Sequence, residues 1–198
     1  MTAYLIATME VHDADAYEAY KAAVPALIEK HGGRYVVRGG AHEVVEGTWP
    51  GGRIVVLEFP DLASANAFAD DPDYAPVAEI RNRTTTSHIW IVEGPAGGAR
   101  AEGNHAYIVG NIRMTDAEGY RPYSEQVPPI LAATKGIFLA RGGTARSLEG
   151  GVELDRLVIV AFPDMESCRA FYEGDAYGEI KPIRIAASDS NIVLVEGL

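Results

Sequence analysis

Two pairs of tyrosines are the first residues in this sequence whose spacing suggests chemistry. Tyr17 precedes Tyr20, and Tyr120 precedes Tyr123, by three positions within segments of helical pattern. Residues three apart share one face of a helix, so both rings of a pair point the same way. A phenol that faces a cleft can donate a proton or orient a substrate carbonyl, and we take Tyr17 and Tyr20 as catalytic candidates. The alternative is that the rings pack on a sheet with their hydroxyls in solvent.

Arginines supply candidate sites for a substrate carboxylate. Arg38 and Arg141 each precede Gly-Gly, where the backbone can bend, so each guanidinium could clamp an anion or tie the bend to a carbonyl. Arg81 follows Tyr74 by about two helical turns and shares its face, and Arg184 is placed in the same way further along. We expect Tyr74 and these arginines to bind substrate. The alternative is that the aliphatic part of each arginine side chain packs against the protein while its guanidinium group reaches water.

A Gly-rich loop carries a second group of candidates. Glu46 and Arg53 flank this loop, and at the base of a hairpin we expect them to form a cross-strand ion pair. In the other interpretation Arg53 binds a substrate carboxylate. Trp49 in the loop and Glu58 after it are further candidates for substrate binding, although Val152 stands where a second Trp would be expected.

Histidine and cysteine give little support for a metal site. His88 begins a strand and could act as a base near neutral pH, with a capping or surface role as the alternative. The five histidines form no HxH or HExxH pattern, and the one cysteine, Cys168, allows neither an intrachain disulfide nor a CxxC motif. We expect no metal and no cofactor; a haem ligand has no support in the spacing.

Most of these residues occur twice in the chain. Tyr4 matches Tyr107 and, at the same offset, Phe59-Pro60-Asp61 matches Phe162-Pro163-Asp164. The match needs no gap, and about a third of the paired positions are identical, which indicates an internal duplication. We therefore expect three parts: a first repeat over residues 1–94, a Gly/Ala-rich linker over 95–104, and a second repeat over 105–198.

Each repeat has the β-α-β-β-α-β order of a ferredoxin-like domain. Strands are expected in the first repeat at residues 3–11, 34–38, 53–59 and 88–92, with 42–46 continuing extended after a bend at Gly39-Gly40. Helices are expected from residue 14 and after Pro60-Asp61, the second interrupted at Asp71-Pro72. Pro25 and Pro128 should kink or end their helices and free the carbonyls near Lys21 and Ser124.

The strand Arg53 to Phe59 is apolar on both of its faces, as is its counterpart in the second repeat. Helices can cover only one face of a ferredoxin-like sheet, so the other face needs a second cover. The sheet of the other repeat is the simplest candidate. The predicted fold is therefore α+β, with two repeats paired sheet-to-sheet as a barrel within one chain.

The order of these residues resembles a known bacterial family. A Tyr-x-x-Tyr helix, Arg-Gly-Gly, a Trp-containing loop, a strand ending Glu-Phe-Pro and a closing Val-Glu-Gly are typical of the family of domains of unknown function numbered 1330, in the dimeric α/β-barrel superfamily. The resemblance implies the ferredoxin-like fold and sheet-to-sheet pairing. The superfamily includes cofactor-free monooxygenases, isomerases, cyclases, haem enzymes and stress-induced proteins, many of which use the cleft between sheet and helices, so function comes by analogy of fold.

Composition limits the partners of the protein. A net charge of −11 argues against nucleic acid or an anionic membrane as the main partner. The sequence shows neither a signal peptide nor an apolar run of membrane-spanning length, so we expect a cytoplasmic protein. The expected partner is a small-molecule ligand. The chain would be a pseudo-dimer by itself, with higher homo-oligomers left open.

The functional hypothesis is a cofactor-independent enzyme that acts on a hydrophobic or aromatic organic acid by monooxygenation, isomerisation or cyclisation. The alternatives are a non-catalytic binding or stress-response protein of the same fold, and a structural module whose pocket is filled. Polar residues differ between the repeats, as at Thr8 and Asn111, so one repeat is expected to hold the site. The first repeat is preferred for its Trp49, Glu58 and His88.

Overall fold

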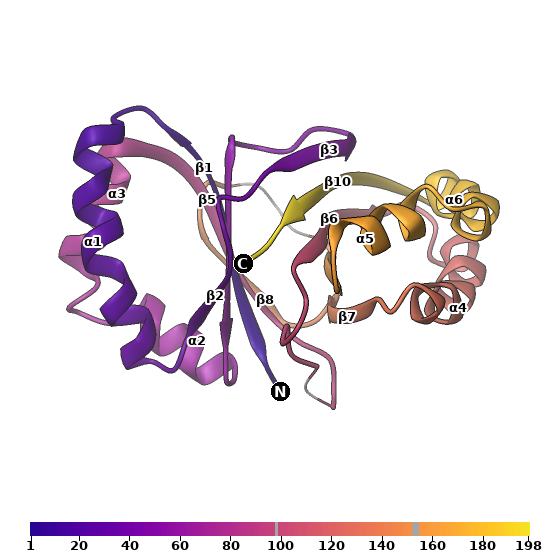
Figure 1. Cartoon of the computed structure of the whole chain (residues 1–198), viewed down its shortest axis with the longest axis horizontal. Helices are drawn as coiled ribbons and strands as arrows, with labels where there is room; N and C mark the ends of the chain where they lie inside the picture. Colours follow the sequence, from indigo (N-terminus) through magenta and orange to yellow (C-terminus); the bar gives the residue numbers. More distant parts are fainter. Residues whose placement is uncertain (98, 152–154) are drawn as a thin grey trace.

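The computed structural model describes residues 1–97, 99–151 and 155–198, and shows two antiparallel sheets packed against each other with helices on both outer faces (Figure 1). This arrangement confirms the predicted α+β class and the pairing of two ferredoxin-like repeats. Gly98 of the linker and Val152, the counterpart of Trp49, lie outside the described residues.

In the first repeat the elements are β1 (Ala3–Val11), α1 (Ala14–Lys30), β2 (Arg34–Arg38), β3 (His42–Glu46), β4 (Arg53–Phe59), α2 (Leu62–Ala69), α3 (Ala75–Thr84) and β5 (Thr85–Glu93). In the second they are β6 (Ala106–Met114), α4 (Ala117–Ala133), β7 (Ile137–Arg141), β8 (Ala145–Glu149), β9 (Leu157–Phe162), α5 (Met165–Tyr172), α6 (Asp175–Ala187) and β10 (Ser188–Glu196).

Local signals in the sequence explain where the helices begin and how they continue. Asp13 and Asp61 cap α1 and α2 by accepting hydrogen bonds from backbone N–H groups three residues ahead. The helix α1 continues through Pro25, and α4 continues through Pro128, so neither proline ends its helix. The carbonyl that Pro128 leaves without its helical partner, that of Ser124, accepts a hydrogen bond from Nη2 of Arg141 at 2.5 Å. None of the helices in the described residues combines the length and the apolar character that crossing a membrane requires.

Each sheet takes one edge strand from the other repeat. The strand orders are β2-β4-β1-β5-β8 and β3-β10-β6-β9-β7, so β3 pairs with β10 and β8 pairs with β5 (Figure 1). The chain leaves its own sheet at Gly39, which has a φ of 76°, a conformation that favours glycine. A Cβ atom at Gly40 would collide with the backbone carbonyl oxygen of Glu196, so the crossing also needs a residue without a side chain.

The exchanged strands end in glutamates that bind buried arginines of the other repeat. Glu46, at the end of β3, accepts two hydrogen bonds from Arg184: Nη1 to Oε2 at 2.9 Å and Nη2 to Oε1 at 2.5 Å. Glu149, at the end of β8, binds Nη2 of Arg81. The expected ion pair between Glu46 and Arg53 is therefore wrong, because β3 and β4 are not neighbours in a hairpin: β3 belongs to the second sheet.

Glu46 holds its charge in this half-buried position. Burial alone would raise the pKa of its carboxyl, but hydrogen bonds from Arg184 and Tyr172 outweigh that effect and lower the pKa below its ordinary value. Tyr172 donates its hydroxyl to Oε1 of Glu46 at 2.5 Å. The exchange thus places an ionised carboxylate beside an arginine that is 0% exposed.

Replacing Glu46 by alanine should destabilise the protein by about 3–5 kcal/mol, because it leaves Arg184 buried with no counter-charge. The matched control is Asp189→Ala, which breaks the exposed pair with Arg113 and should cost less than about 1 kcal/mol. The free energies of unfolding can be compared by urea denaturation followed by circular dichroism. Equal losses in the two variants would show that the exchanged strand contributes no buried ion pair.

Candidate functional site

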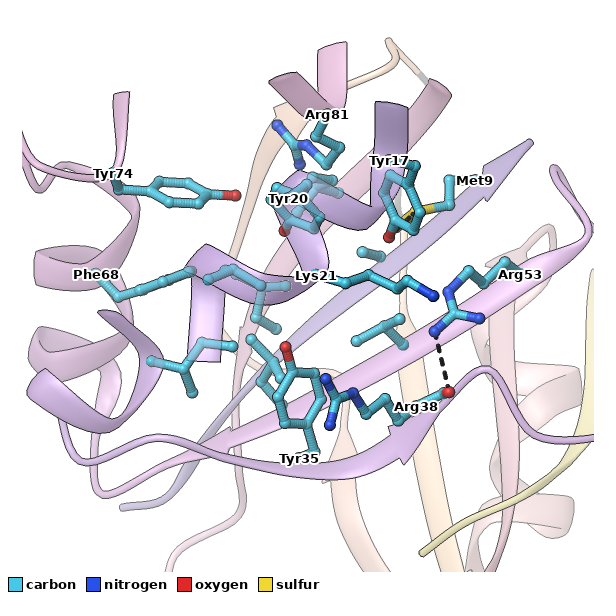
Figure 2. A pocket seen from close by; sticks show the side chains of 17 residues that line it. Met9, Tyr17, Tyr20, Lys21, Tyr35, Arg38, Arg53, Phe68, Tyr74 and Arg81 are labelled. Atoms are coloured by element: carbon cyan, nitrogen blue, oxygen red, sulfur yellow. Dashed lines mark hydrogen bonds between the residues drawn. The ribbon is translucent and has the colours of Figure 1, made fainter. Parts of the chain in front are cut away.

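A cleft lies under α1, on the helix side of the first sheet. Its cavity measures about 30 Å³, within about 480 Å³ of space between the lining side chains that includes the open solvent at its mouth. Residues of β1, α1, β2, β4 and α3 line it, and their side chains converge from several directions (Figure 2). The polar lining consists of four tyrosines and four cations: Tyr17, Tyr20, Tyr35, Tyr74, Lys21, Arg38, Arg53 and Arg81.

Three phenols of this cleft, those of Tyr17, Tyr20 and Tyr35, are held in the neutral form. Burial raises the pKa of Tyr17 and of Tyr35, although Arg53 and Arg38, respectively, oppose the shift. Burial, together with the neighbouring Tyr74, raises the pKa of Tyr20 well above its ordinary value. The rings of Tyr17 and Tyr20 stack with centroids 5.3 Å apart, as their spacing on one helix face predicts. These phenols can therefore donate hydrogen bonds or protons, and they are poor general bases at neutral pH.

Three cations gather at the mouth of the cleft. Nη2 of Arg53 donates to the carbonyl oxygen of Arg38 at 3.1 Å, and the guanidinium of Arg38 lies over the ring of Tyr35 at 4.6 Å (Figure 2). Lys21 points toward Arg53 in the same view and pairs with the exposed Glu18 at 2.5 Å. Around the mouth these side chains border a wide surface hollow of about 350 Å³. With one carboxylate among three cations, the mouth carries net positive charge.

Arg81 closes the opposite side of the cleft from Arg38 (Figure 2). Its side chain is 2% exposed, and its guanidinium carbon lies 5.9 Å from the centroid of the Tyr20 ring. Nη2 donates to Glu149 and, at 2.9 Å, to Oδ1 of Asn82. A neighbouring groove of about 220 Å³, which Arg81 and Glu149 also line, runs between α3 and the exchanged strand β8. Residues of the second repeat therefore form part of the surroundings of the first repeat's cleft.

The equivalent cleft of the second repeat has lost this polar lining. Its cavity measures about 40 Å³ and is lined by apolar side chains and three tyrosines, with no cation among its described lining. Ser124 stands in place of Lys21, and Phe138 in place of Tyr35. Arg184 binds Glu46 through both of its terminal nitrogens, and Arg141 donates to a helix carbonyl. The two predicted binding residues Arg141 and Arg184 thus hold structure together and do not line this cleft.

Three residues predicted for the site lie on the other side of the first sheet, which requires a correction. Glu58 is 0% exposed between the two sheets, where it accepts hydrogen bonds from the Tyr4 hydroxyl at 3.3 Å and the Ala101 N–H at 2.7 Å. Trp49 packs against the same inter-sheet core. The ring of His88 stacks on Trp90, a residue of that core, with centroids 6.0 Å apart. Side chains alternate along a strand, so Glu58 and His88 face away from the helices.

The structure brings six of the predicted residues together at the cleft: Tyr17, Tyr20, Arg38, Arg53, Tyr74 and Arg81. Sequence reasoning missed Lys21 and Tyr35, which complete the polar lining. Their counterparts Ser124 and Phe138 differ in charge or polarity, and this difference between the repeats was the available signal. Among the described residues, no group of three or more histidine, cysteine, aspartate or glutamate side chains is arranged to hold a metal ion.

The fold and these clefts define a dimeric α/β-barrel protein in which both halves of the barrel come from one chain. The chain belongs to the family described as a domain of unknown function (DUF1330), whose model matches it twice, over residues 2–95 and 105–198. The chain has no significant sequence match among curated proteins.

Solved structures share this fold at low sequence identity. A proposed monooxygenase from Lactobacillus acidophilus NCFM matches with a TM-score of 0.57 and 9% identity, covering 100% of this chain and 98% of the other. A mutant chlorite dismutase from Candidatus Nitrospira defluvii in complex with cyanide matches with a TM-score of 0.59 and 13% identity, covering 100% and 90%. An anthrone oxidase-like protein matches with a TM-score of 0.53 and 13% identity, covering 100% and 91%. At such identities the likeness shows the fold alone.

The raised phenol pKa values predict a specific response to alkaline pH. A group whose pKa is higher in the folded state than in the unfolded state adds stability that is complete below the unfolded pKa, about 10 for tyrosine, and is lost as the pH rises above it. Absorbance at 295 nm should show phenols that ionise only as the protein unfolds, and Tyr20→Phe should remove one of them. A phenolate that forms near neutral pH in the folded protein would contradict this description of the cleft.

Proposed function

We propose that the first repeat's cleft binds a small hydrophobic or aromatic organic acid. Its carboxylate lies at the cationic mouth formed by Lys21, Arg38 and Arg53, and its apolar part lies among the tyrosine rings. The observation that carries the proposal is the difference between the two clefts: cations converge at the first and are absent from the described lining of the second. Planar guanidinium groups recognise carboxylates well, and aromatic walls suit an apolar or aromatic body.

The reaction that this lining favours is one in which negative charge develops on an oxygen. Neutral phenols and fixed cations stabilise an enolate or phenolate more strongly than its neutral precursor. Isomerisation, cyclisation and cofactor-independent monooxygenation of an organic acid all pass through such an anion. Two proteins of the same fold, a proposed monooxygenase and an anthrone oxidase-like protein, have descriptions that are compatible with this chemistry. The link from these proteins to this chain is an analogy of fold.

A non-catalytic binding protein is the second candidate, and one observation favours it. The described lining of the cleft contains no carboxylate and no histidine, and burial raises the pKa of Tyr17, Tyr20 and Tyr35. A site without a strong base can hold an acid without transforming it. Incubation with a panel of aromatic and keto acids, followed by ¹H NMR, separates the two: turnover that Tyr20→Phe abolishes supports the enzyme, and saturable binding without product supports the binding protein.

Benzoate should bind the wild-type protein, and Arg53→Met should weaken that binding about 10- to 100-fold, because a charge-assisted hydrogen bond contributes about 1.5–3 kcal/mol. Methionine keeps an unbranched apolar side chain of similar reach. The matched control is Arg156→Met, which changes the equivalent arginine of the second repeat and should leave the affinity unchanged. Isothermal titration calorimetry gives all three values.

If benzoate and the other acids of the panel do not bind, the proposal fails. An equal loss of affinity in Arg53→Met and Arg156→Met would also contradict it, because the site could not then be assigned to the first repeat.

A further inference from the structure

Arg81 has unused hydrogen-bonding capacity inside the cleft. Its Nε and Nη1 atoms are buried and have no hydrogen-bond partner among the described residues. Burying an N–H group without an acceptor costs free energy, so such groups in a native protein indicate a missing partner. Figure 2 shows the guanidinium group of Arg81 above the ring of Tyr20, on the cleft side of α3. An oxygen atom of a bound ligand is the acceptor that this position can receive.

The equivalent arginine of the second repeat, Arg184, has more of its nitrogens satisfied, and only its Nε is buried without a hydrogen-bond partner among the described residues. Both terminal nitrogens of Arg184 bind Glu46, and Nη1 also donates to the Ser190 hydroxyl at 2.7 Å. In the first repeat the exchanged glutamate is turned differently: one oxygen of Glu149 binds Arg81, and the other accepts from the Ser87 hydroxyl at 3.1 Å. Both terminal nitrogens of Arg184 are therefore engaged, whereas Arg81 keeps its terminal nitrogen Nη1, in addition to Nε, for another acceptor.

The charges at the two sides of the cleft also differ. Glu149 offsets the charge of Arg81, so this side presents hydrogen-bond donors with little net charge. The mouth, with Lys21, Arg38 and Arg53 against Glu18 alone, stays positive. A carboxylate is therefore attracted to the mouth, while a second carboxylate beside Arg81 would meet the carboxylate of Glu149 at short range.

We propose that this cleft selects acids that carry a neutral oxygen, a carbonyl or a hydroxyl, on the end opposite the carboxylate, with Arg81 donating to that oxygen and Glu149 of the second repeat rejecting a second anion. The inference rests on the proposed function, because it assumes that the carboxylate occupies the mouth. Arg81 becomes a specificity-determining residue, and Glu149 acts through it as a positioning residue.

Three benzoate probes that differ only at the para position test the inference in the wild-type protein. Benzoate has no para group, 4-carbamoylbenzoate has a neutral carbonyl, and terephthalate has a second carboxylate of nearly the same shape. Calorimetry should show that 4-carbamoylbenzoate binds at least about fivefold more tightly than benzoate, since one added hydrogen bond contributes about 1 kcal/mol or more. Terephthalate should bind no more tightly than benzoate.

A glutamine at position 149 removes the charge and keeps the shape. Glu149→Gln should therefore raise the affinity for terephthalate relative to 4-carbamoylbenzoate by about tenfold, the effect of one close like charge. Glu46→Gln, the same change beside Arg184, should leave the order of the three probes unchanged, because Arg184 is not among the described residues that line the cleft of either repeat. If either variant fails to fold, the wild-type order of affinities still decides.

The outcomes separate this inference from the proposed function. If benzoate does not bind, the proposed function fails and the selectivity fails with it. If benzoate binds but 4-carbamoylbenzoate gains nothing, or terephthalate binds most tightly to the wild type, the mouth site stands and the role given to Arg81 and Glu149 is overturned.

Discussion

The reciprocal exchange of edge strands is the constraint on which the rest of this structure depends. Each repeat sends one short strand into the other repeat's sheet, and each strand ends in a glutamate that meets a buried arginine. Removing one partner of such a pair leaves an uncompensated charge in the interior, so neither repeat can keep its arginine buried without the other. The exchange explains why the protein is built as a barrel within one chain, and it brings β8 to the edge of the first repeat's cleft.

The duplication has left two clefts with different properties in the same molecule. The first keeps its cations and four phenols, and the second has replaced or engaged the corresponding groups. Arg141 binds the carbonyl of Ser124, and Arg184 binds both oxygens of Glu46. These two arginines are the counterparts of Arg38 and Arg81, and in the second repeat they stabilise the fold. The second repeat thus provides a natural reference for the first, because the backbone is shared and the chemistry is different.

Much of this architecture could be predicted from the sequence, because duplication, strand pattern and Gly-Gly bends are local signals. The strand exchange could not be predicted in the same way: the segment His42–Glu46 has the same pattern whichever sheet it joins, and the decision depends on the close approach of Gly40 to Glu196. The tyrosine pair and the arginines near the helices were placed by helical periodicity.

Glu58 and His88 were misplaced for a different reason. A polar residue stands out in an apolar strand, but the face of the sheet on which it lies depends on the register of the strand. Both faces of these strands are buried, so the sequence pattern does not show which face is which. The comparison of the two repeats was more informative than residue type, since Lys21 and Tyr35 differ between them at the cleft itself.

The location of a bound acid is the most direct test of this account. Crystals soaked with 4-bromobenzoate can be measured at the bromine absorption edge, where the anomalous signal marks the ring without interpretation of weak density. The account predicts a bromine peak under α1 of the first repeat, on the Arg81 side of the cleft, with the carboxylate toward Arg53. A peak in the second repeat's cleft, or between the two sheets near His88, would contradict it.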